Sequence, residues 1–587
     1  MKEIKTFGNL WKYLKTYNKQ LILALVLLII NVLMTVVEPF VLGLAITEIT
    51  QNVVDIARGA EGAAINYEYI ITILIVYVIR GFIVQGTNYG SNVYITIAVQ
   101  NMTRDLRDDI IRKIHRLPVA YFDRNQFGDI LGRITSDVET VSNSLQQGII
   151  QVTTAFFSII FVTIMMLTLN WQLALIVFIS MPISYFVAQS VVKISQQHFK
   201  KQADVLGRMN GFVQENFTGF NIIRLYGRED SSVEEFRTIT GELADIGFKA
   251  SFLSSLMMPL VSVVSHLAYL VVAVVGGMFT IAGRLTVGNL QAFTQYVWQI
   301  NQPIQMVTQI TGLLQAAVAA TQRIWEVLDQ EEELNEVTEE IPSPVTGQVT
   351  FDDVSFQYTP TKPLIRDFSV KVKPGETIAI VGPTGAGKTT MINLLMRFYD
   401  VDKGSIRLDG VDNRAVSRQK YREQFGMVLQ DAWLFEGTIK ENLRFGNLDA
   451  TDEQIVEAAK AANVDHFIRT LPGGYENRMN QESSNISLGQ KQLLTIARAL
   501  LSDPKILILD EATSSVDTRL EQLIQKAMER LMEGRTSFVI AHRLSTIQDA
   551  DRILVMKDGQ IIEHGNHEQL LEQKGFYYDL YQSQFNT

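Results

Sequence analysis

Six long apolar stretches in the first half of the chain restrict its fold more than any other feature. They lie near residues 20–46, 68–95, 148–169, 172–193, 253–281 and 289–320. A helix needs about 20 mostly apolar residues to cross a bilayer core about 30 Å thick. Only helices and closed barrels pair every backbone group inside lipid, and the alternation typical of barrel strands is absent. The sequence therefore predicts an all-α domain of six transmembrane helices over residues 1–328.

The distribution of positive charge predicts how these helices are oriented. Residues 97–147 and 194–250 are rich in Lys and Arg, whereas the loop 47–67 contains only Arg58. Cytoplasmic loops carry an excess of Lys and Arg, so both long stretches and both termini are expected in the cytoplasm. As helices that continue out of the membrane, such stretches reach about 30 Å below it. Because the chain is compact and shows no targeting extension, we expect it in the plasma membrane of a prokaryote.

A stripe of glutamines on the sixth span is a candidate cargo path. Its members are Gln291, Gln295, Gln299, Gln302, Gln305 and Gln309. Spacings of three and four residues place these amides on one helical face, which is unsuited to lipid. Such a face either hydrogen-bonds neighbouring helices, at about 0.6–2 kcal/mol per contact, or lines a water-filled cavity. The stripe has more amides than helix packing usually needs, so we favour the cavity.

Two ionisable residues, Glu38 and Arg80, lie inside predicted spans. A charge that faces lipid is costly, so both side chains should turn inward or reach the membrane interface. Glu38 precedes Pro39 and can therefore lie in a kinked part of the first span. Glu38 either attracts a cationic cargo, which makes it a second candidate for the cargo path, or forms a structural pair.

Composition limits the chemistry that the whole chain can perform. The absence of cysteine excludes disulfides and thiolate metal sites. A net charge of −10 argues against nucleic acid as a partner, because that role usually needs a basic surface. Residues 329–345 combine a run of acids with Pro342 and Pro344, which is typical of a solvated linker without chemistry. Residues 346–587 then show the alternating pattern of an α/β domain.

A phosphate-binding loop is the first strong motif of this α/β domain. The pattern G-x-x-x-x-G-K-T follows an apolar strand at 377–381 and precedes a helix at 390–398. Its glycines let backbone N–H groups surround phosphate oxygens, and Lys388 reaches the outer phosphates. Thr389 offers its hydroxyl to Mg²⁺. The expected nucleotide-binding residues of the loop are Gly382, Thr384, Gly385, Ala386, Gly387, Lys388, Thr389 and Thr390.

A second motif is the apolar run 506–509 followed by Asp510 and Glu511. It is typical of a buried parallel strand that ends in two carboxylates. Asp510 is placed to hold the water shell of the metal, and Glu511 can polarise an attacking water. Alone this run is weak, because apolar strands often end in Asp. Together with the upstream phosphate loop it predicts a site for ATP hydrolysis.

At this point the α/β domain resembles the ATP-binding cassette (ABC) superfamily, and the whole chain resembles an exporter-type half-transporter. Tyr358 stands where the family places the aromatic that stacks on adenine. Gln430 resembles the glutamine that senses Mg²⁺ and the membrane domain. Asp517 lies in a segment like the D-loop, and His542 resembles the switch histidine that contacts the γ-phosphate. The resemblance covers essentially the whole chain, with six spans before the cassette as in exporters.

This resemblance implies in-line attack of water on the γ-phosphate of ATP. Glu511 would act as base or orient the water, and His542 would steady the developing charge. Lys388 and Mg²⁺ would neutralise the phosphates, with Thr389 and Gln430 as the metal ligands. ATP and Mg²⁺ are therefore the expected cofactors.

The signature segment departs from the family pattern. The family reads Leu-Ser-Gly-Gly-Gln, whereas residues 486–490 read Ile-Ser-Leu-Gly-Gln. In the family this segment opens a helix whose amides and serine hydroxyl meet ATP held by the partner's phosphate loop, and glycine permits the close approach. Leu488 puts a bulky side chain there, and residues 480–483 also differ from the common exporter pattern. The signature residues of this chain are Ser487, Leu488, Gly489 and Gln490.

An altered signature predicts an unequal pair of ATP sites. The cassettes of this family pair head to tail, so a homodimer would place Leu488 in both sites. We therefore expect a heterodimer with a second six-span half-transporter that has a regular signature and replaced catalytic residues. This chain then resembles the catalytic-site half of heterodimeric bacterial multidrug exporters.

The expected cargo is a small amphipathic compound, with drugs or xenobiotics as the leading class. A lipid flippase or a siderophore transporter on the same fold is the alternative. An ATP-gated channel or a regulatory subunit is disfavoured, because Glu511 and His542 are intact.

Overall fold

The computed structural model describes most of the chain. The described residues are 2–60, 64–333, 337–359, 364–429, 432–479, 486–510, 518–540 and 547–585. They divide into two units, of which the first contains Met1–His115 and Phe127–Gln330. The second contains Arg116–Gln126 and Glu331–Thr587. A short segment between two long helices of the first unit therefore belongs with the α/β cassette.

Long helices build the first unit. They are α1 (Lys2–Leu14), α2 (Asn18–Ala57), α3 (Tyr67–Ile114), α6 (Val138–Leu169), α7 (Trp171–Thr218), α9 (Glu229–Ser255), α10 (Met257–Ile281) and α11 (Val287–Leu328). Within the described residues, five helical segments, containing α2, α3, α6, α7 and α10, are long and apolar enough to cross a membrane. The sixth predicted span lies on α11, whose 42 residues include the glutamine stripe.

Capping residues mark where several of these helices begin, and a glycine turn follows the end of α2. α2 continues to Ala57, past the predicted end at residue 46, and the chain turns at Gly59 with φ +70°. The side chain of Asn66 caps the start of α3, and that of Asn170 caps the start of α7. Thr286 does the same for α11. Outside the bilayer a helix ends where such side chains satisfy its free N–H groups or where a glycine turns the chain.

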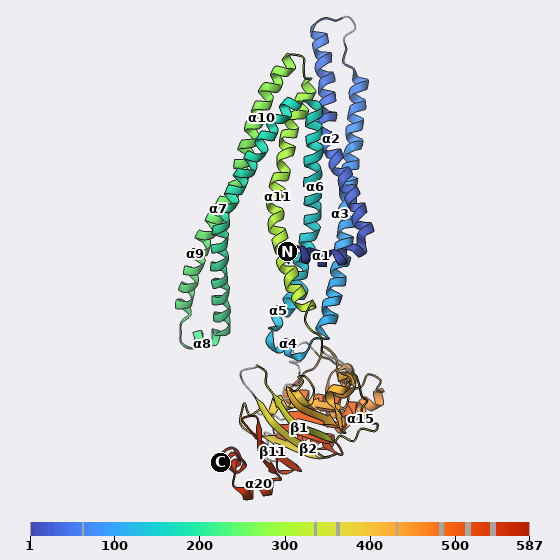
Figure 1. Ribbon diagram of the computed structural model, residues 1–587, viewed down its shortest axis with the longest axis vertical. Helices are drawn as coiled ribbons and strands as arrows, with labels where there is room; N and C mark the ends of the chain where they lie inside the picture. Colours follow the sequence, from blue (N-terminus) through green and yellow to red (C-terminus); the bar gives the residue numbers. More distant parts are fainter. Residues whose placement is uncertain are drawn as a thin grey trace. The chain divides into compact units, whose positions relative to one another are not determined.

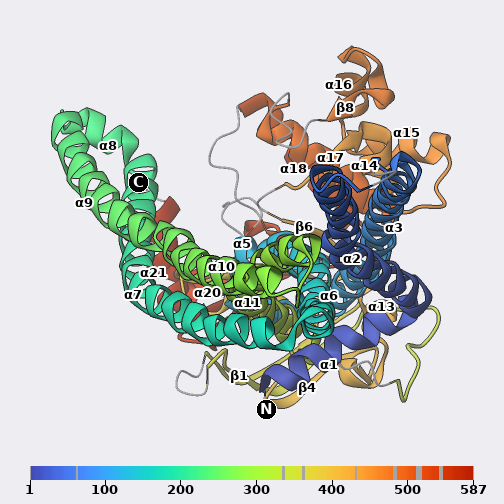
Figure 2. The same ribbon diagram turned by 90° about the horizontal axis from the view of Figure 1, so that it is seen from above.

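The helices of the first unit form two groups (Figure 1). α2, α3, α6 and α11 run side by side, whereas α7, α9 and α10 form a second group that separates from α11 toward α8 (Phe220–Leu225). The same separation is visible from above in Figure 2. Where the groups meet, Val36 of α2, Val177 of α7 and Tyr296 of α11 share one buried apolar cluster.

Short helices connect α3 to α6. They are α4 (Val119–Arg124), α5 (Phe127–Gly132) and the π-helical turn η2 (Arg133–Asp137). Asp137 in η2 is buried and accepts two bonds from Arg323 of α11, from Nε at 2.8 Å and from a terminal nitrogen at 2.5 Å. This bidentate pair joins the C-terminal part of α11 to the start of α6.

Three sheets form the cassette. The first is antiparallel, in the order β2 (Ile365–Val372), β1 (Val349–Phe356), β4 (Lys403–Leu408) and β5 (Val411–Asp412). The second has the order β12 (Gln560–Gly565), β11 (Arg552–Lys557), β3 (Thr377–Val381), β10 (Thr536–Ile540), β9 (Ile506–Asp510) and β6 (Phe425–Val428), with only β12 antiparallel to its neighbour. The third pairs β7 (Gly437–Thr438) with β8 (Arg478–Met479).

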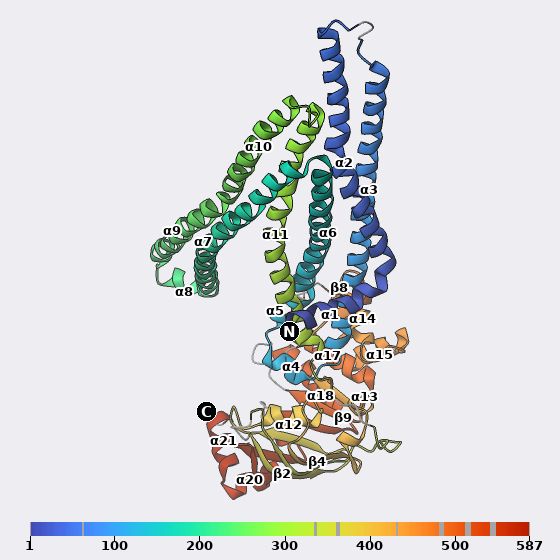
Figure 3. The same cartoon turned by 45° about the horizontal axis from the view of Figure 1, so that its top comes forward.

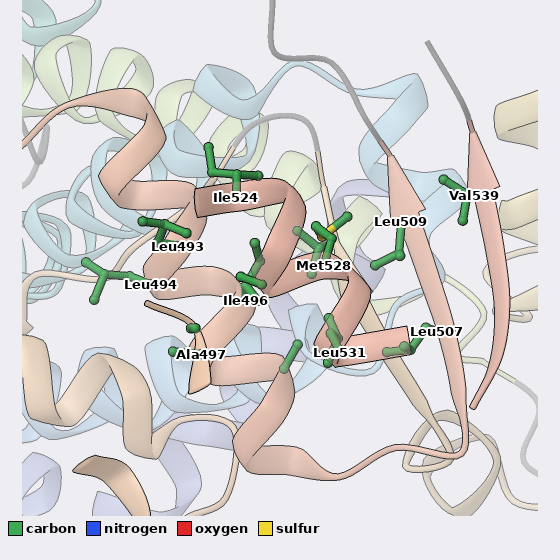
Figure 4. Close-up of a cluster of buried hydrophobic side chains, with 14 of the residues drawn as sticks. Leu493, Leu494, Ile496, Ala497, Leu507, Leu509, Ile524, Met528, Leu531 and Val539 are labelled. Carbon is green, nitrogen blue, oxygen red and sulfur yellow. The ribbon is translucent and has the colours of Figure 1, made fainter. Parts of the chain in front are cut away.

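The cassette also contains helices of 5 to 15 residues. They include α12 (Lys388–Leu395), α13 (Arg418–Arg422), α14 (Ile439–Arg444), α15 (Asp452–Ala461), α16 (Asp465–Thr470), α17 (Leu488–Ser502), α18 (Thr518–Met532), α20 (His567–Gln573) and α21 (Phe576–Phe585). Figure 3 shows α20 and α21 together at the C-terminal end. In Figure 4, Leu493 of α17 and Met528 of α18 belong to one buried cluster with Leu509 of β9 and Val539 of β10. The helix that begins with the signature is therefore packed into the core that also holds β9.

Candidate nucleotide site and cargo path

The carboxyl ends of three neighbouring parallel strands form one edge of the large sheet. The register pairs Ile540 of β10 with Ile380 of β3 on one side and with Asp510 of β9 on the other. The phosphate loop departs from this edge and Asp510 lies on it, which is where ligand sites of open α/β sheets form. Glu511 and His542 lie outside the described residues, so their catalytic roles stay predictions.

Two glycines fix the shape of the phosphate loop. Gly382 has φ +154°, and a Cβ on it would lie 2.2 Å from the carbonyl oxygen of Met556. Gly387 has φ +101°, and a Cβ on it would lie 2.9 Å from Cδ1 of Ile365. Larger residues would strain both positions. Gly387 is also the N-cap of α12 and supplies no side-chain bond, so the first N–H groups of this helix are open to an anion.

Lys388 lies across this loop at the start of α12. Its Nζ donates to the carbonyl oxygens of Gly382 at 2.7 Å and Pro383 at 3.1 Å. Burial lowers the pKa of the Lys388 ammonium, whereas the charge of Asp510 acts in the opposite direction. Thr389 beside it is exposed. An amine, open backbone N–H groups, a hydroxyl and a carboxylate fit a nucleoside triphosphate with Mg²⁺.

The other predicted loop residues complete one continuous turn at the sheet edge. Ala386 is buried, and its carbonyl oxygen accepts a bond of 3.1 Å from the N–H of Gly559. Gly385 has φ +83°, Thr384 is exposed and Thr390 is buried. The structure therefore brings the whole predicted loop together next to Asp510.

Tyr358 lies in an aromatic cluster beside α12. Its ring centroid is 4.9 Å from that of Phe356 and 4.9 Å from that of Tyr399, with near-perpendicular rings in both pairs. Nδ2 of Asn393 on α12 donates to the Tyr358 hydroxyl at 3.2 Å. The predicted adenine contact is therefore held by the helix that follows the phosphate loop. Gln430 and Asp517, predicted for the same site, lie outside the described residues.

The signature residues form a capped helix start. Ser487 is the N-cap of α17, and its hydroxyl accepts from the N–H of Gln490 at 3.4 Å while the Gln490 side chain accepts from the N–H of Ser487 at 3.0 Å. Gly489 is buried, whereas Leu488 is 42% exposed. The side chain that replaces the family's glycine thus points out at the helix N-terminus.

Arg498 is a connecting residue of α17 that the sequence analysis missed. Its Nε donates to the carbonyl oxygen of Asn442 at 2.9 Å, and a terminal nitrogen donates to that of Trp433 at 3.1 Å. Burial lowers the pKa of Arg498. The signature helix is therefore tied to the chain just after Gln430. Nothing in the sequence pattern separates this arginine from an ordinary polar residue of an amphipathic helix.

An apolar groove adjoins Arg498. It has a volume of about 260 Å³ and is lined by Phe425, Met427, Leu429, Trp433, Phe445 and Arg498 among others. Trp433 is 68% exposed and Phe445 is 58% exposed. Exposed aromatics around a groove of this kind are typical of a protein interface.

The glutamine stripe on α11 contains buried amides without partners. The Oε1 atoms of Gln291 and Gln299 are buried and have no hydrogen-bond partner within the described residues. Gln295 is half-buried and Gln302 is exposed. The alternative of interhelical hydrogen bonding requires partners for these oxygens. The side chains of Gln305 and Gln309 lie outside the described residues.

Glu38 forms the structural pair that the sequence left open. Its carboxylate lies 2.8 Å from a terminal nitrogen of Arg80 and accepts a bond of 2.7 Å from the hydroxyl of Tyr77. Arg80 also donates to the carbonyl oxygen of Met34 at 2.9 Å. The two charges therefore compensate each other between α2 and α3.

One acid of the linker is held by the folded chain, whereas Glu331, Glu332, Glu339 and Glu340 are exposed, as expected of a solvated segment. Glu333 accepts from Arg422 at 3.1 Å and lies 3.9 Å from Arg418. Its N–H donates to the carbonyl oxygen of Arg116 at 2.9 Å. Two arginine side chains of the same unit, those of Arg422 and Arg418, therefore hold this one acid.

Comparisons with known proteins agree with both units. Residues 21–304 match the family described as ABC transporter transmembrane region, and residues 365–514 match the family described as ABC transporter. A fatty acid ABC transporter ATP-binding/permease protein of Mycobacterium tuberculosis is 46% identical over 486 residues, which cover 83% of this chain and 77% of that protein. An ATP-dependent lipid A-core flippase of Desulfotalea psychrophila is 37% identical over 518 residues, covering 88% and 90%.

A solved structure extends this similarity to the whole chain. It is that of a bacterial Atm1-family ABC exporter with ATP bound, with a TM-score of 0.77 and 26% identity over 97% of this chain and 98% of that one. The predicted fold class, a helical transmembrane domain followed by an α/β nucleotide-binding domain, is confirmed. The predicted cofactors, ATP with Mg²⁺, are confirmed as well.

Proposed function

Because the chain belongs to the ABC transporter family, we propose that it exports amphipathic compounds, drugs among them, as one half of a heterodimer in a prokaryotic plasma membrane. The chain is a membrane exporter that couples ATP hydrolysis to transport and acts in a dimer. We assign residues 1–328 to the membrane domain, 329–345 to the linker and 346–587 to the nucleotide-binding domain. The single observation that carries the cargo proposal is the pair of buried amide oxygens on α11, those of Gln291 and Gln299, which have no partner among the described residues.

The surroundings of these amides suit a cargo with a polar group and an apolar body. Gln291 and Gln299 offer amide donors and acceptors. Trp298 is 42% exposed, and its ring lies 4.9 Å from that of His266 on α10. Glu38 is compensated by Arg80, so at that position the path presents no unpaired carboxylate. Amide and aromatic groups bind molecules that combine a polar group with an apolar body, and they do not require that the cargo carry a charge of one sign.

A lipid-like cargo is the second candidate. The relatives reported above are named for fatty acids and for lipid A, and the first of them is 46% identical to this chain. An acyl compound has the polar head and apolar body that the same path would accommodate.

The heterodimer proposal rests on the contrast between the two contributions of this chain, one to each of the two ATP sites. In this proposal the chain supplies Lys388, Asp510, Glu511 and His542 to one full site, with Tyr358, Thr389 and Gln430 holding the nucleotide and its Mg²⁺. Its own signature, from Ser487 to Gln490, and Asp517 complete the partner's degenerate site. Leu488 supports this assignment because it is exposed at the N-terminus of α17.

The short helix α8 between α7 and α9 also supports a requirement for a partner. Phe220, Ile222, Leu225 and Tyr226 are all more than half exposed. Such an apolar short helix needs a cover. We assign it to the partner's counterpart of the groove around Trp433, since that groove offers exposed aromatic rings.

ATPase assays in lipid nanodiscs test the proposed function. The complex is purified through a tag on this chain and is exposed to a cationic dye, rhodamine 6G, or to oleic acid. Stimulation by the dye supports drug export, and stimulation by oleic acid alone supports the lipid candidate. Gln299→Ala should change the stimulation profile, whereas Gln189→Ala, on the exposed face of α7, should not. Stimulation by neither compound, with identical profiles for both variants, would contradict an amphipathic cargo.

A further inference from the structure

Tyr399 joins the cassette to α4. Its hydroxyl donates a hydrogen bond to the carboxylate of Asp123, which lies on α4 and 276 residues away in the sequence. Residues 116–126 belong to the same unit as the cassette, so this contact lies within one unit. In the chain, α4 follows α3 and precedes α6, and both of those helices belong to segments apolar enough to span the membrane.

The ring of Tyr399 also contacts the predicted adenine-binding residue. Its centroid lies 4.9 Å from that of Tyr358 at an interplanar angle of 85°, and 5.5 Å from that of Phe356 at 63°. Asn393 of α12 fixes the Tyr358 hydroxyl at 3.2 Å. One side chain therefore touches both the aromatic cluster of the nucleotide site and the helix that leads to the membrane domain.

The backbone around Tyr399 is firmly held. Arg397 has φ +53°, and its guanidinium donates to the carbonyl oxygens of Asn413 at 2.6 Å and Val416 at 2.8 Å. Arg418 in turn donates to the carbonyl oxygen of Arg397 at 2.6 Å. Burial, with the hydrogen bond to Asp123 second, raises the pKa of Tyr399, so its hydroxyl stays a donor. Because its backbone is fixed, Tyr399 can respond to a change at Tyr358 only by a rotation of its side chain, which moves the ring and the hydroxyl together.

We propose that Tyr399 is a positioning residue that transmits adenine occupancy at Tyr358 to Asp123 on α4, and so to α3 and α6. The inference rests on the proposed adenine contact of Tyr358. A base that stacks on Tyr358 fixes the orientation of its ring. The perpendicular ring of Tyr399 then takes one orientation, which sets the direction of its bond to Asp123.

A second link holds the same loop to the cassette without touching Tyr358. The N–H of Glu333 donates to the carbonyl oxygen of Arg116 at 2.9 Å, and Glu333 pairs with Arg422 at 3.1 Å. This link remains when the Tyr399 hydroxyl is removed. Tyr399→Phe should therefore leave α4 docked while it loses the directional bond.

The test follows α4 through a single thiol. Gln126→Cys places it at an exposed residue just after α4, in a chain that has no other cysteine. Its reaction with a water-soluble maleimide is timed in the full-length complex, with and without ATPγS and Mg²⁺. ATP affinity is measured in the same samples with a fluorescent ATP analogue. Tyr475→Phe is the matched control, because it removes another tyrosine–aspartate bond of the cassette, that from Tyr475 to Asp465 at 2.7 Å.

We expect nucleotide to change the labelling rate by about fivefold or more, the range of typical coupling between sites. Tyr399→Phe and Asp123→Ala should reduce this change to less than about twofold with ATP affinity unaltered. Asp123→Asn, which keeps an acceptor, and Tyr475→Phe should retain it. A purely structural bond would alter labelling equally with and without nucleotide.

Retention of the full nucleotide-dependent change in Tyr399→Phe would overturn the inference, as would the lack of any change in the parent. Tyr358→Ala separates the inference from its premise. If that variant binds ATP as tightly as the parent, the adenine assignment itself fails. If it binds ATP weakly while Tyr399→Phe retains the labelling change, only the transmission through Tyr399 fails.

Discussion

Two helices of the cassette begin at segments that the family uses for phosphate, and they begin differently. α12 starts after Gly387, which gives no side-chain cap and leaves the first N–H groups open. α17 starts after Ser487, whose side chain forms a reciprocal capping box with Gln490. At the first position of α12 stands Lys388, whereas at the first position of α17 stands the exposed Leu488.

This difference separates a helix start that is open to phosphate from one whose N–H groups are partly capped. An uncapped N-terminus with a lysine has unsatisfied donors that favour an anion. A capped N-terminus has already satisfied part of its donors, and we expect a leucine there to keep another molecule's phosphate at a distance. We infer that the phosphate loop of this chain contributes strongly to one ATP site. Its signature contributes weakly to the other.

The largest expected effect directly tests whether the phosphate-loop end and the signature end of this chain contribute unequally to ATP turnover. Glu511→Gln should lower the ATP turnover of the complex by about 10²- to 10⁴-fold, because it removes the group that orients or deprotonates water. Ser487→Ala is the matched change at the signature end and should lower turnover by less than about tenfold, the effect of one neutral hydrogen bond. Phosphate release at saturating ATP measures both. Equal losses would show that the two ends serve equivalent sites.

The next effect concerns ATP affinity. Lys388→Ala should weaken ATP binding by about 10- to 100-fold, since hydrogen bonds from charged groups contribute about 1.5–3 kcal/mol. The exposed Lys373 provides the control, and Lys373→Ala should leave affinity unchanged. Titration with a fluorescent ATP analogue measures both. Unchanged affinity in Lys388→Ala would contradict the phosphate-loop assignment.

A smaller effect sharpens the comparison at the signature end. Leu488→Gly should raise the ATPase rate of this chain purified alone by about two- to tenfold, because the backbone can then approach phosphate and regain one hydrogen bond. Leu488→Ala shows whether a smaller side chain is sufficient to raise the ATPase rate, or whether glycine is required. A rate that stays the same in both variants would mean that Leu488 does not limit the site.

The smallest effect concerns the cargo path. Gln295→Ala should change the stimulation of ATPase activity by a given compound about threefold, the equivalent of about 0.6 kcal/mol for one hydrogen bond within a membrane. Basal activity should stay unchanged. If thiols introduced at Gln295 and Gln302 resist a water-soluble reagent in every transport state, the stripe packs against other helices instead.

Hydrophobic length predicted six spans, and five described helical segments are long and apolar enough to cross a membrane, but this length did not predict where the helices end. The thickness of a bilayer sets the apolar length expected of α2, whereas the end of this helix at Ala57 depends on the turn at Gly59. The sequence pattern also could not predict which side chains form hydrogen bonds and ion pairs between helices. Glu38 could be placed inside a span, but its bond to Tyr77 and its ion pair with Arg80 depend on how α2 and α3 pack.

The nucleotide site was predictable where residues act through local spacing. The phosphate loop is one turn between a strand and a helix, so its glycines and Lys388 could be assigned from sequence alone. Tyr399 and Arg498 act across long sequence distances. Their partners, Asp123 for one and Trp433 for the other, become neighbours only when the cassette and its loops have folded.

The most direct test of the account is the composition and activity of the complex purified from native membranes through a tag on this chain. Native mass spectrometry identifies the subunits, and phosphate release gives the ATPase rate. The account predicts one copy of this chain with one different half-transporter, a rate severalfold above that of the chain alone, and near-complete loss with Glu511→Gln. A stable dimer of this chain alone with full, cargo-stimulated ATPase activity would contradict it.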